Sequence, residues 1–233
     1  MSKNIFVAGA SRGLGFFIAK KYLEDGHKVF AGVRNTSSSE FKDLQDKYPD
    51  TLLPVIIEVR DTNSLTLAAK TVSEKVDNID ILINNAGVHC DSSFEILEDT
   101  NLDDSLFVYD VNAMGPMRVA KAFLTLLRKK GGKVINISSE SGSIGDCKRE
   151  KEFDYCMSKA ALNMGTKLLS NYLRKDNIMV LTIQPGWMRT DMGGANAALD
   201  PYETACKLVS LFDGYNDMNA PIFIDNEGQP LPW

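Results

Sequence analysis

Tyr155 and Lys159 are the two side chains whose types and spacing best suit the movement of a proton. Residues four apart on a helix lie on one face and approach within interaction distance. A free phenol has a pKa of about 10. An ammonium within about 4–6 Å favours the phenolate and lowers that pKa by about one to three units. The pair is therefore a candidate proton relay. The alternative is an exposed tyrosine–lysine pair without a function, which is common on solvated helix faces.

Three glycines, Gly9, Gly13 and Gly15, follow the first apolar run of the chain. Glycines allow a tight turn and let the backbone approach a pyrophosphate, while the next helix offers N–H groups and its positive end to that anion. The G-x3-G-x-G spacing differs from the common G-x-G-x-x-G fingerprint. Its place between a strand and a helix favours a dinucleotide-binding loop over a glycine-rich turn without a ligand.

Two arginines indicate which dinucleotide this loop would bind. An NAD-preferring site usually has an acidic residue after the second strand, where it meets the ribose 2′-hydroxyl. No acidic residue occurs between Gly26 and Glu40, whereas Arg12 lies in the glycine loop and Arg34 follows the second strand. Guanidinium groups clamp a 2′-phosphate with charge-assisted bonds, so the pattern favours NADP over NAD. The alternative is two solvated surface arginines.

The elements that must position these residues alternate between short apolar runs and longer amphipathic stretches. Strands are predicted at residues 5–8, 28–33, 53–59, 79–84, 133–138, 178–183 and 222–224. Helices are predicted at residues 13–25, 38–48, 63–76, 102–130 and 154–175, with a last one from Pro201. This alternation predicts one α/β domain over residues 1–233, a doubly wound parallel sheet with helices on both faces. Ligands of such sheets bind outside the carboxyl ends of the strands.

Composition excludes several other classes of protein. The chain has 44% hydrophobic residues and a formal net charge of −5, which suit a folded core and argue against nucleic acid or anionic membrane as a partner. Its four cysteines form no C-x-x-C pair and it has two histidines, so no metal site is expected. The first apolar run is too short for a signal peptide or a membrane span. These features predict a reducing, cytoplasmic location.

Taken together along the chain, the motifs resemble the short-chain dehydrogenase/reductase family. They are the glycine loop, Asn84-Asn85-Ala86-Gly87, Asn112 in Val-Asn-Ala, Ser139 in Asn-Ile-Ser-Ser, Tyr155-x3-Lys159, and Pro185-Gly186 followed by Thr190. The resemblance covers essentially the whole chain. It implies a Rossmann fold and NAD(P)-dependent hydride transfer to or from a carbonyl or an alcohol.

The resemblance also implies a role for each matching residue. Tyr155 would be the general acid in reduction, Ser139 would hold the substrate oxygen, and Asn112 would hold a water of the proton relay. Lys159 would bind the nicotinamide ribose and lower the pKa of Tyr155. The cofactor contacts implied are Gly9, Ser11, Arg12, Gly13, Leu14, Gly15, Arg34, Glu58, Val59, Asn85, Ala86, Gly87, Tyr155, Lys159, Pro185, Gly186, Met188 and Thr190.

Within the family the chain resembles the carbonyl-reductase-like branch related to the C-factor signalling proteins, on residues 185–192 and 225–233. Three departures stand out. Ala8 replaces a common threonine, which removes one hydrogen bond to the neighbouring loop. Glu58 replaces the aspartate that usually meets the adenine amine. A charged insert at residues 146–152 is predicted to be a solvated loop that borders the site.

The sequence therefore predicts an NADPH-dependent reductase that converts an aldehyde, ketone or quinone to the alcohol. Family habit suggests a homodimer, with a monomer or tetramer as alternatives, and the helix at residues 102–130 is the expected interface. One alternative function is an NAD-preferring alcohol dehydrogenase of the same family. The other is a non-catalytic NAD(P)-binding signalling or sensor protein, although such a protein has little reason to keep the relay residues.

Overall fold

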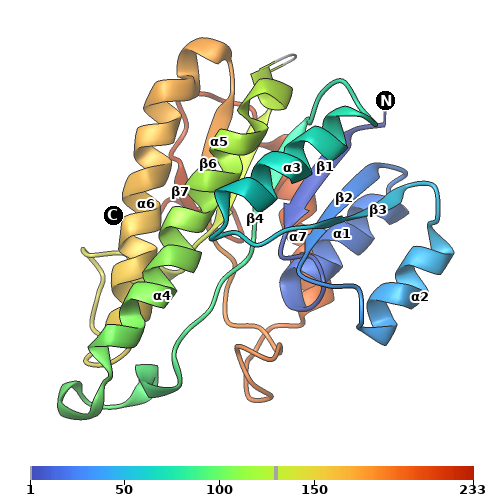
Figure 1. The fold of residues 1–233 in the computed structure, drawn as a ribbon. Helices are drawn as coiled ribbons and strands as arrows, with labels where there is room; N and C mark the ends of the chain where they lie inside the picture. Colours follow the sequence, from blue (N-terminus) through green and yellow to red (C-terminus); the bar gives the residue numbers. More distant parts are fainter. Residues whose placement is uncertain (1, 129–130) are drawn as a thin grey trace.

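The computed structural model describes residues 2–128 and 131–233, and within these residues seven strands form one parallel sheet (Figure 1). The order across the sheet is β3-β2-β1-β4-β5-β6-β7. The strands are β1 (Asn4–Ala8), β2 (Lys28–Val33), β3 (Leu52–Ile56), β4 (Ile81–Asn84), β5 (Lys133–Ile137), β6 (Met179–Gln184) and β7 (Phe223–Asp225). The predicted doubly wound fold is confirmed, and β3 ends three residues earlier than expected.

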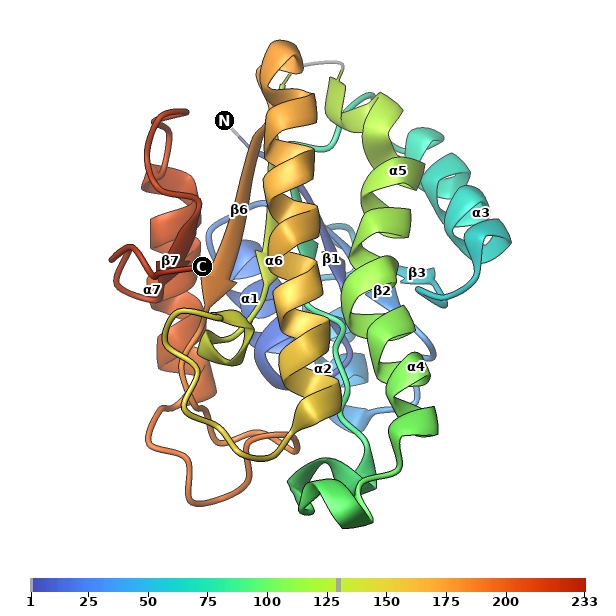
Figure 2. The ribbon, with the colours of Figure 1, turned by 90° about the vertical axis from the view of Figure 1, so that its left-hand side faces the viewer.

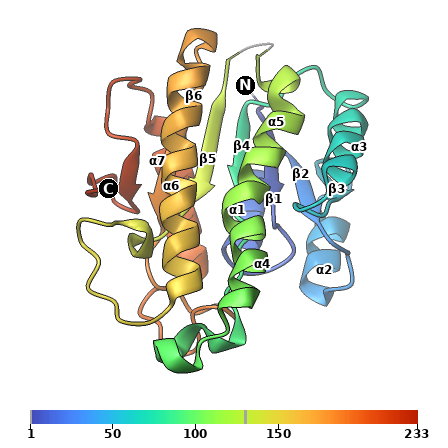
Figure 3. The same ribbon diagram turned by 60° about the vertical axis from the view of Figure 1, so that its left-hand side comes forward.

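Helices cover both faces of this sheet (Figure 3). They are α1 (Gly13–Glu24), α2 (Ser39–Lys47), α3 (Thr62–Ser73), α4 (Ser105–Tyr109), α5 (Gly115–Arg128), α6 (Phe153–Leu173) and α7 (Pro201–Gly214). One hydrophobic core lies beneath α1, α2 and α7, and a second lies beneath α3, α5 and α6. Along β1, Ile5 and Val7 enter the first core while Phe6 and Ala8 enter the second. Burial on both faces explains why the strands read as continuous apolar runs.

Several helix ends follow from side chains that were visible in the sequence. Ser38 accepts a hydrogen bond from the N–H of Phe41 at the start of α2, and Asp61 does so from Asn63 at the start of α3. Asp200 accepts from two N–H groups at the start of α7, which opens with Pro201. These caps satisfy donors that a helix leaves without partners in its first turn.

The long helix expected at residues 102–130 is found from Ser105 to Arg128, but a π-turn interrupts its regular α-helical bonding. A 3₁₀ turn at Leu102–Asp104 leads into α4, a π-turn at Asp110–Met114 follows, and α5 then runs to Arg128. Residues 129 and 130 lie outside the described residues. Pro116 has no N–H to donate to the carbonyl of Asn112, so regular α-helical bonding fails at this point.

Three long connections gather at the carboxyl ends of the strands (Figures 1 and 2). They follow β4, β5 and β6 and appear in green, yellow and orange at the lower end of both views. The C-terminal segment lies beside the second of them, where Gly145 donates to the carbonyl of Trp233 and Ser143 donates to that of Pro232. The substrate end of the sheet is therefore built from segments far apart in sequence.

The glycine loop after β1 packs directly on the loop after β4. The N–H groups of Asn85 and Ala86 both donate to the carbonyl of Ala8, and Asn85 Nδ2 donates to the carbonyl of Gly9 at 2.9 Å. A Cβ on Gly15 would lie 2.2 Å from that Gly9 oxygen and 2.4 Å from Asn85 Nδ2. The backbone thus joins the two loops despite Ala8, and Gly15 is required by the fold itself.

We expect Gly15→Ala to reduce the free energy of unfolding by about 1–3 kcal/mol, because the added methyl overpacks a backbone contact that cannot move away. Urea unfolding measures the change. Gly214→Ala is the matched control, since nothing lies within 4 Å of its added Cβ and it ends a helix. The control should be neutral or stabilising. Equal stability of Gly15→Ala and the unchanged protein would contradict this account of the loop.

Candidate active site

The predicted site residues meet where the strand order reverses. β1 and β4 are neighbours in the sheet, but the chain leaves them toward opposite edges. In open α/β sheets this switch point forms the crevice in which ligands bind. The glycine loop follows β1 and the segment Asn85-Ala86-Gly87 follows β4, so both border this crevice.

The first turn of α1 suits a phosphate group. Its N-cap residue, Arg12, makes no side-chain capping bond, in contrast to the caps of α2, α3 and α7. Free N–H groups at a helix N-terminus and the positive end of its dipole attract anions. Gly9 and Gly13, with φ values of 85° and 58°, turn the backbone in front of them. The residues present therefore fit the pyrophosphate of a dinucleotide.

The two predicted phosphate-binding arginines differ in their surroundings. Arg34 is exposed directly after β2. Arg12 reaches across the crevice, where its Nη1 forms an ion pair of 2.6 Å with Asp191 of the loop after β6. Both partners are largely exposed, so this pair contributes about 0–1 kcal/mol and a phosphate can compete for the guanidinium.

Glu58, the expected adenine contact, and Val59, a further expected cofactor contact, follow the end of β3. Glu58 Oε1 accepts hydrogen bonds from the side chain and the backbone N–H of Arg60. The backbone N–H of Glu58 donates a hydrogen bond to Ser64 Oγ. Val59 is buried against Gly115. The contacts of both residues with an adenine stay a prediction.

The loop after β6 closes against the glycine loop. Thr190 lies near Gly13, whose added Cβ would be 3.7 Å from the threonine methyl group. Gly186 has a φ of 90°, and its added Cβ would lie 2.3 Å from Leu199. Met188 is buried in the core under α1 and α7. The cofactor contacts predicted for Pro185, Gly186, Met188 and Thr190 stay a prediction.

α6 carries Tyr155 and Lys159 on the face that lies against the sheet. Lys159 is 4% exposed, and its Nζ donates a hydrogen bond of 2.9 Å to the carbonyl of Ile137 at the end of β5. The same Nζ lies 5.4 Å from the centroid of the Tyr155 ring. The two residues share a helix face, as their spacing predicts.

The pKa of Tyr155 is shifted in this structure by groups other than Lys159. Burial, followed by the negative charge of Glu140, raises the pKa of Tyr155 to about 12, while Ser139 and Arg149 act in the opposite direction. Burial also lowers the pKa of Lys159 to about 8, which leaves its ammonium largely protonated at neutral pH. The lowering of the Tyr155 pKa by Lys159 stays a prediction, and the phenol by itself is held in its protonated form.

Ser139 follows β5 and begins the short turn in front of α6. Its Oγ accepts a hydrogen bond of 3.1 Å from the N–H of Ser141 and donates one of 2.8 Å to Glu140 Oε2. Glu140 was not singled out from the sequence, because an acidic side chain next to a serine carries no motif of its own. Its carboxylate lies beside the hydroxyl of Ser139, one of the predicted relay residues.

The side chain of Asn112 is fully engaged with protein groups. Its Oδ1 accepts from the N–H of Val88, and its Nδ2 donates to the carbonyl of Val88 and to Ser158 Oγ. Both amide protons are used, so this side chain has no proton left for a water. The predicted water contact would fall to the backbone carbonyl of Asn112, which Pro116 deprives of its α-helical donor.

Asn163 is a structural residue of the site that the sequence motifs did not single out. Its Oδ1 accepts from Ser138 Oγ at 2.8 Å and from Thr182 Oγ1 at 3.0 Å. Its Nδ2 donates to the carbonyl of Gly142 at 3.1 Å. One buried amide thus ties β5, β6 and the turn after Ser139 to α6. Extending the four-residue spacing of Tyr155 and Lys159 by one step would have found it.

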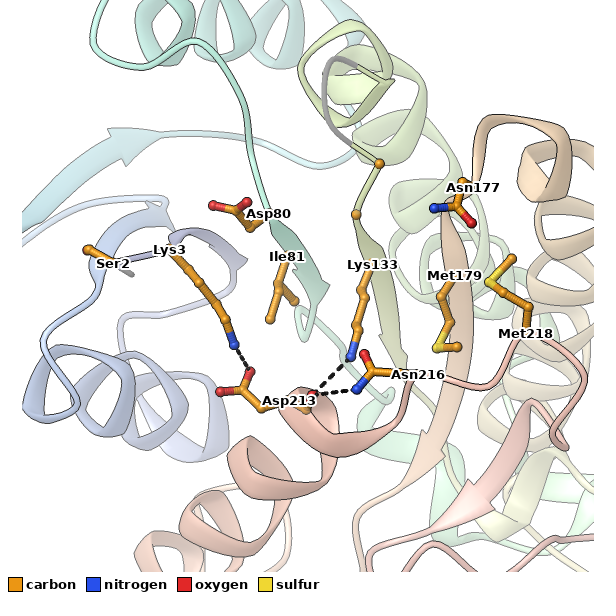
Figure 4. A pocket seen from close by; sticks show the side chains of 12 residues that line it. Ser2, Lys3, Asp80, Ile81, Lys133, Asn177, Met179, Asp213, Asn216 and Met218 are labelled. Carbon is orange, nitrogen blue, oxygen red and sulfur yellow. Dashed lines mark hydrogen bonds and ion pairs between the residues drawn. The ribbon is translucent and has the colours of Figure 1, made fainter.

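A pocket of about 490 Å³ lies at the opposite end of the strands from the predicted site (Figure 4). It is lined by residues at the amino ends of the strands, and Lys3 pairs there with Asp213. Lys133 Nζ donates to the carbonyls of Phe212 and Tyr215 at the end of α7, which is a structural role. This pocket is remote from the catalytic set, so the crevice at the carboxyl ends remains the candidate active site.

In residues 2–128 and 131–233, no group of three or more histidine, cysteine, aspartate or glutamate side chains is arranged to hold a metal ion. In the same part of the chain, no helix has both the length and the apolar character needed to cross a membrane.

Comparisons with known proteins agree with this geometry. Residues 3–199 match the family model described as short chain dehydrogenase. The chain is 35% identical over 156 residues to C-signal of Myxococcus xanthus, which covers 66% of this chain and 93% of that protein. It superposes on the NADPH-bound carbonyl reductase from chicken fatty liver with a TM-score of 0.90, 30% identity, and coverage of 100% and 99%. Carbonyl reductase Sniffer of D. melanogaster gives a TM-score of 0.93 and 28% identity, with both chains fully covered.

Proposed function

The chain belongs to the short-chain dehydrogenase/reductase family, in its carbonyl-reductase-like branch, and on this premise we propose that it is an NADPH-dependent carbonyl reductase. Members of this family are oxidoreductases that bind nicotinamide cofactors. The proposed substrate is an aldehyde, ketone or quinone, and the product is the alcohol.

The observation that carries this proposal is the contact between the cofactor loop and the relay residues. A Cβ on Gly87 would lie 3.5 Å from Asn112 Oδ1 and 3.8 Å from Lys159 Nζ. The segment after β4 therefore lies directly beside the residues that handle the proton. A hydride donor and an acid meet at one carbonyl only when their sites adjoin in this way.

The proposed reaction needs one hydride and one proton. The nicotinamide, when bound, supplies the hydride to the carbonyl carbon, and Tyr155 Oη donates the proton to the carbonyl oxygen. Ser139 Oγ donates a hydrogen bond to the same oxygen and stabilises the negative charge that develops on it. Because burial keeps Tyr155 protonated, the resting side chain is already in the form that reduction requires.

We expect Tyr155→Phe to lower kcat by about 10²–10⁴-fold with cofactor affinity nearly unchanged, because the variant loses the acid but keeps the ring. NADPH and NADH consumption against a panel of aldehydes, diketones and quinones measures kcat, and cofactor fluorescence titration measures binding. Tyr172→Phe, an exposed tyrosine on the same helix, is the matched control. Full turnover by Tyr155→Phe would refute the mechanism.

The alternative function, a non-catalytic signalling protein that binds NAD(P), draws on the similarity to C-signal. It predicts cofactor binding without turnover across the whole substrate panel. Ser139 and Lys159 are buried and Tyr155 is half-buried beside the cofactor loop. This grouping favours the enzyme, because recognition alone does not require a serine, a tyrosine and a lysine in relay spacing.

Preference for NADPH is the second part of the proposal, and Arg34 is its main support. Arg34 is exposed after β2, whereas Arg12 is already paired with Asp191. We expect Arg34→Ala to lower kcat/KM for NADPH by about ten- to a hundredfold, the loss of one or two charge-assisted bonds. The value for NADH serves as the internal control and should change little. An equal loss with both cofactors would contradict 2′-phosphate recognition by Arg34.

We propose a homodimer formed through the outer face of α6, rather than through the helix expected from the sequence alone. Met157, Met164, Leu168 and Tyr172 follow one face of α6, and each is more than half exposed. A contiguous apolar stripe on a helix is typical of an interface between subunits.

We expect the unchanged protein to sediment as a dimer and Leu168→Glu to sediment as a monomer, because a buried unpaired carboxylate opposes association. Leu67→Glu is the matched control, since Leu67 is similarly exposed on α3 and lies away from the stripe. A monomeric parent protein at micromolar concentration, or a dimer formed by Leu168→Glu, would overturn the proposed interface.

We propose that the partner is a small carbonyl compound rather than nucleic acid or membrane, in keeping with the net charge of −5. All four cysteines, at positions 90, 147, 156 and 206, are free thiols. Free thiols persist in a reducing compartment, so the cytoplasm is the proposed location.

A further inference from the structure

A chain of contacts connects the charged insert to the catalytic serine. Arg149 lies in the insert, and its Nη2 is 2.5 Å from Glu140 Oε1. The other carboxylate oxygen of Glu140 accepts the hydroxyl proton of Ser139 at 2.8 Å. Residues 146–151 are exposed, as expected for a solvated loop that borders the site, and from this loop the side chain of Arg149 reaches Glu140.

The insert is also held at its end and at its side. Arg149 Nη1 pairs with Glu152, which precedes α6 in a left-handed conformation with a φ of 62°. The N–H of Glu152 donates to the carbonyl of Ser93, and Lys151 Nζ donates to the carbonyl of Phe94 at 2.8 Å. These contacts hold the loop that carries Arg149 in a position from which its side chain reaches Glu140.

The hydrogen bond from Ser139 to Glu140 has a direct chemical consequence. A serine hydroxyl has one proton. While that proton is held by a carboxylate, it is not available to an incoming carbonyl oxygen. The N–H of Ser141 already occupies one lone pair of the same Oγ. Ser141 Oγ, at 3.1 Å, is a second acceptor for this proton, but the charged Glu140 Oε2 is nearer at 2.8 Å, so a substrate oxygen must compete mainly with Glu140.

The charges around Tyr155 respond to the same two residues. Burial acts to raise the pKa of Glu140, but the hydrogen bonds from Ser139 and Arg149 bring it below its usual value. The carboxylate thus stays charged, and its charge raises the pKa of Tyr155 while Arg149 lowers it.

The other ionisable groups around Tyr155 belong to α6. Cys156 acts to raise the pKa of Tyr155, and Lys159 lies over the ring of Tyr155. The carboxylate of Asp154 is turned away, because its Oδ2 accepts from Ser93 Oγ and from the N–H of Cys90.

We propose that Glu140 and Arg149 are positioning residues that set how readily Ser139 and Tyr155 give their protons to the substrate oxygen. Glu140 holds the proton of Ser139 and opposes ionisation of Tyr155. Arg149 forms an ion pair with Glu140 and so partly offsets its negative charge. This weakens both the hold of Glu140 on the Ser139 proton and its effect on the ionisation of Tyr155. The inference rests on the proposed reductase function, since it concerns the two groups that meet the carbonyl oxygen.

The two residues must act in opposite directions on the pH profile. Reduction needs protonated Tyr155, so its rate falls as the pH rises through the pKa of Tyr155. Glu140→Gln removes a negative charge and should move this fall to lower pH by roughly half a unit to one unit. Arg149→Met removes a positive charge and should move it to higher pH by a similar amount.

Arg149→Met should also lower kcat/KM by about three- to tenfold, because an unpaired carboxylate holds the Ser139 proton more strongly.

Steady-state reduction across pH, with the same substrate and cofactor for every variant, tests the proposal. Glu150→Gln and Lys148→Met are the matched controls, because they change the same charges on exposed side chains of the same loop. Both should leave the profile in place, and Arg149→Lys should restore most of the Arg149→Met shift. Ultraviolet absorbance of tyrosinate, taken as the difference from Tyr155→Phe, gives the pKa of Tyr155 without turnover.

Opposite shifts by Glu140→Gln and Arg149→Met, with unmoved controls, support the positioning role. Shifts in one common direction, or no shift in either variant, overturn it, since a loop that only supports the fold would respond alike to both losses. Failure of the proposed function looks different, because Tyr155→Phe would then retain turnover. Thermal unfolding of each variant separates a change in the profile from a loss of fold.

Discussion

The polar face of α6 is buried against the carboxyl end of the sheet, and the rest of the site depends on this burial. Lys159 is 4% exposed and Asn163 is 2% exposed. A buried ammonium or amide is tolerated only when its hydrogen bonds are satisfied. The carbonyls of Ile137 and Gly142 supply acceptors, so the end of β5 and the turn after Ser139 are fixed by the same bonds that keep α6 in place.

The electrostatics of the site follow from that burial. A low-dielectric surrounding disfavours both the phenolate of Tyr155 and the ammonium of Lys159, so one pKa rises while the other falls. The phenol of Tyr155 therefore stays protonated, and the amine of Lys159 beside it, with a pKa of about 8, is still largely in its ammonium form at neutral pH. Glu140 and Arg149, which pair at the surface, also act on the pKa of Tyr155 in opposite directions. They lie in a loop region whose sequence can change without disturbing the core.

Much of the fold was predictable, because apolar runs and caps act over short stretches of chain. The strands are predictable from apolar runs that are buried on both faces, and Ser38 and Pro201 mark the starts of α2 and α7. The π-turn before α5 was not predicted, although Pro116 is visible in the sequence. Pro116 removes the N–H that would bond the carbonyl of Asn112, but the sequence pattern does not show that the helix continues past this loss through a π-turn.

The sequence by itself determined the order of elements, the glycine loop and the Tyr155–Lys159 spacing, since each rests on residues close together in the chain. Only the tertiary structure decided that Gly15 must meet the loop after β4, that Asn163 ties two strands to α6, and that Arg149 reaches Glu140. The direction of the Tyr155 pKa shift also belongs to the tertiary structure. Burial and through-space charge depend on segments that the fold brings together, and local spacing does not contain that information.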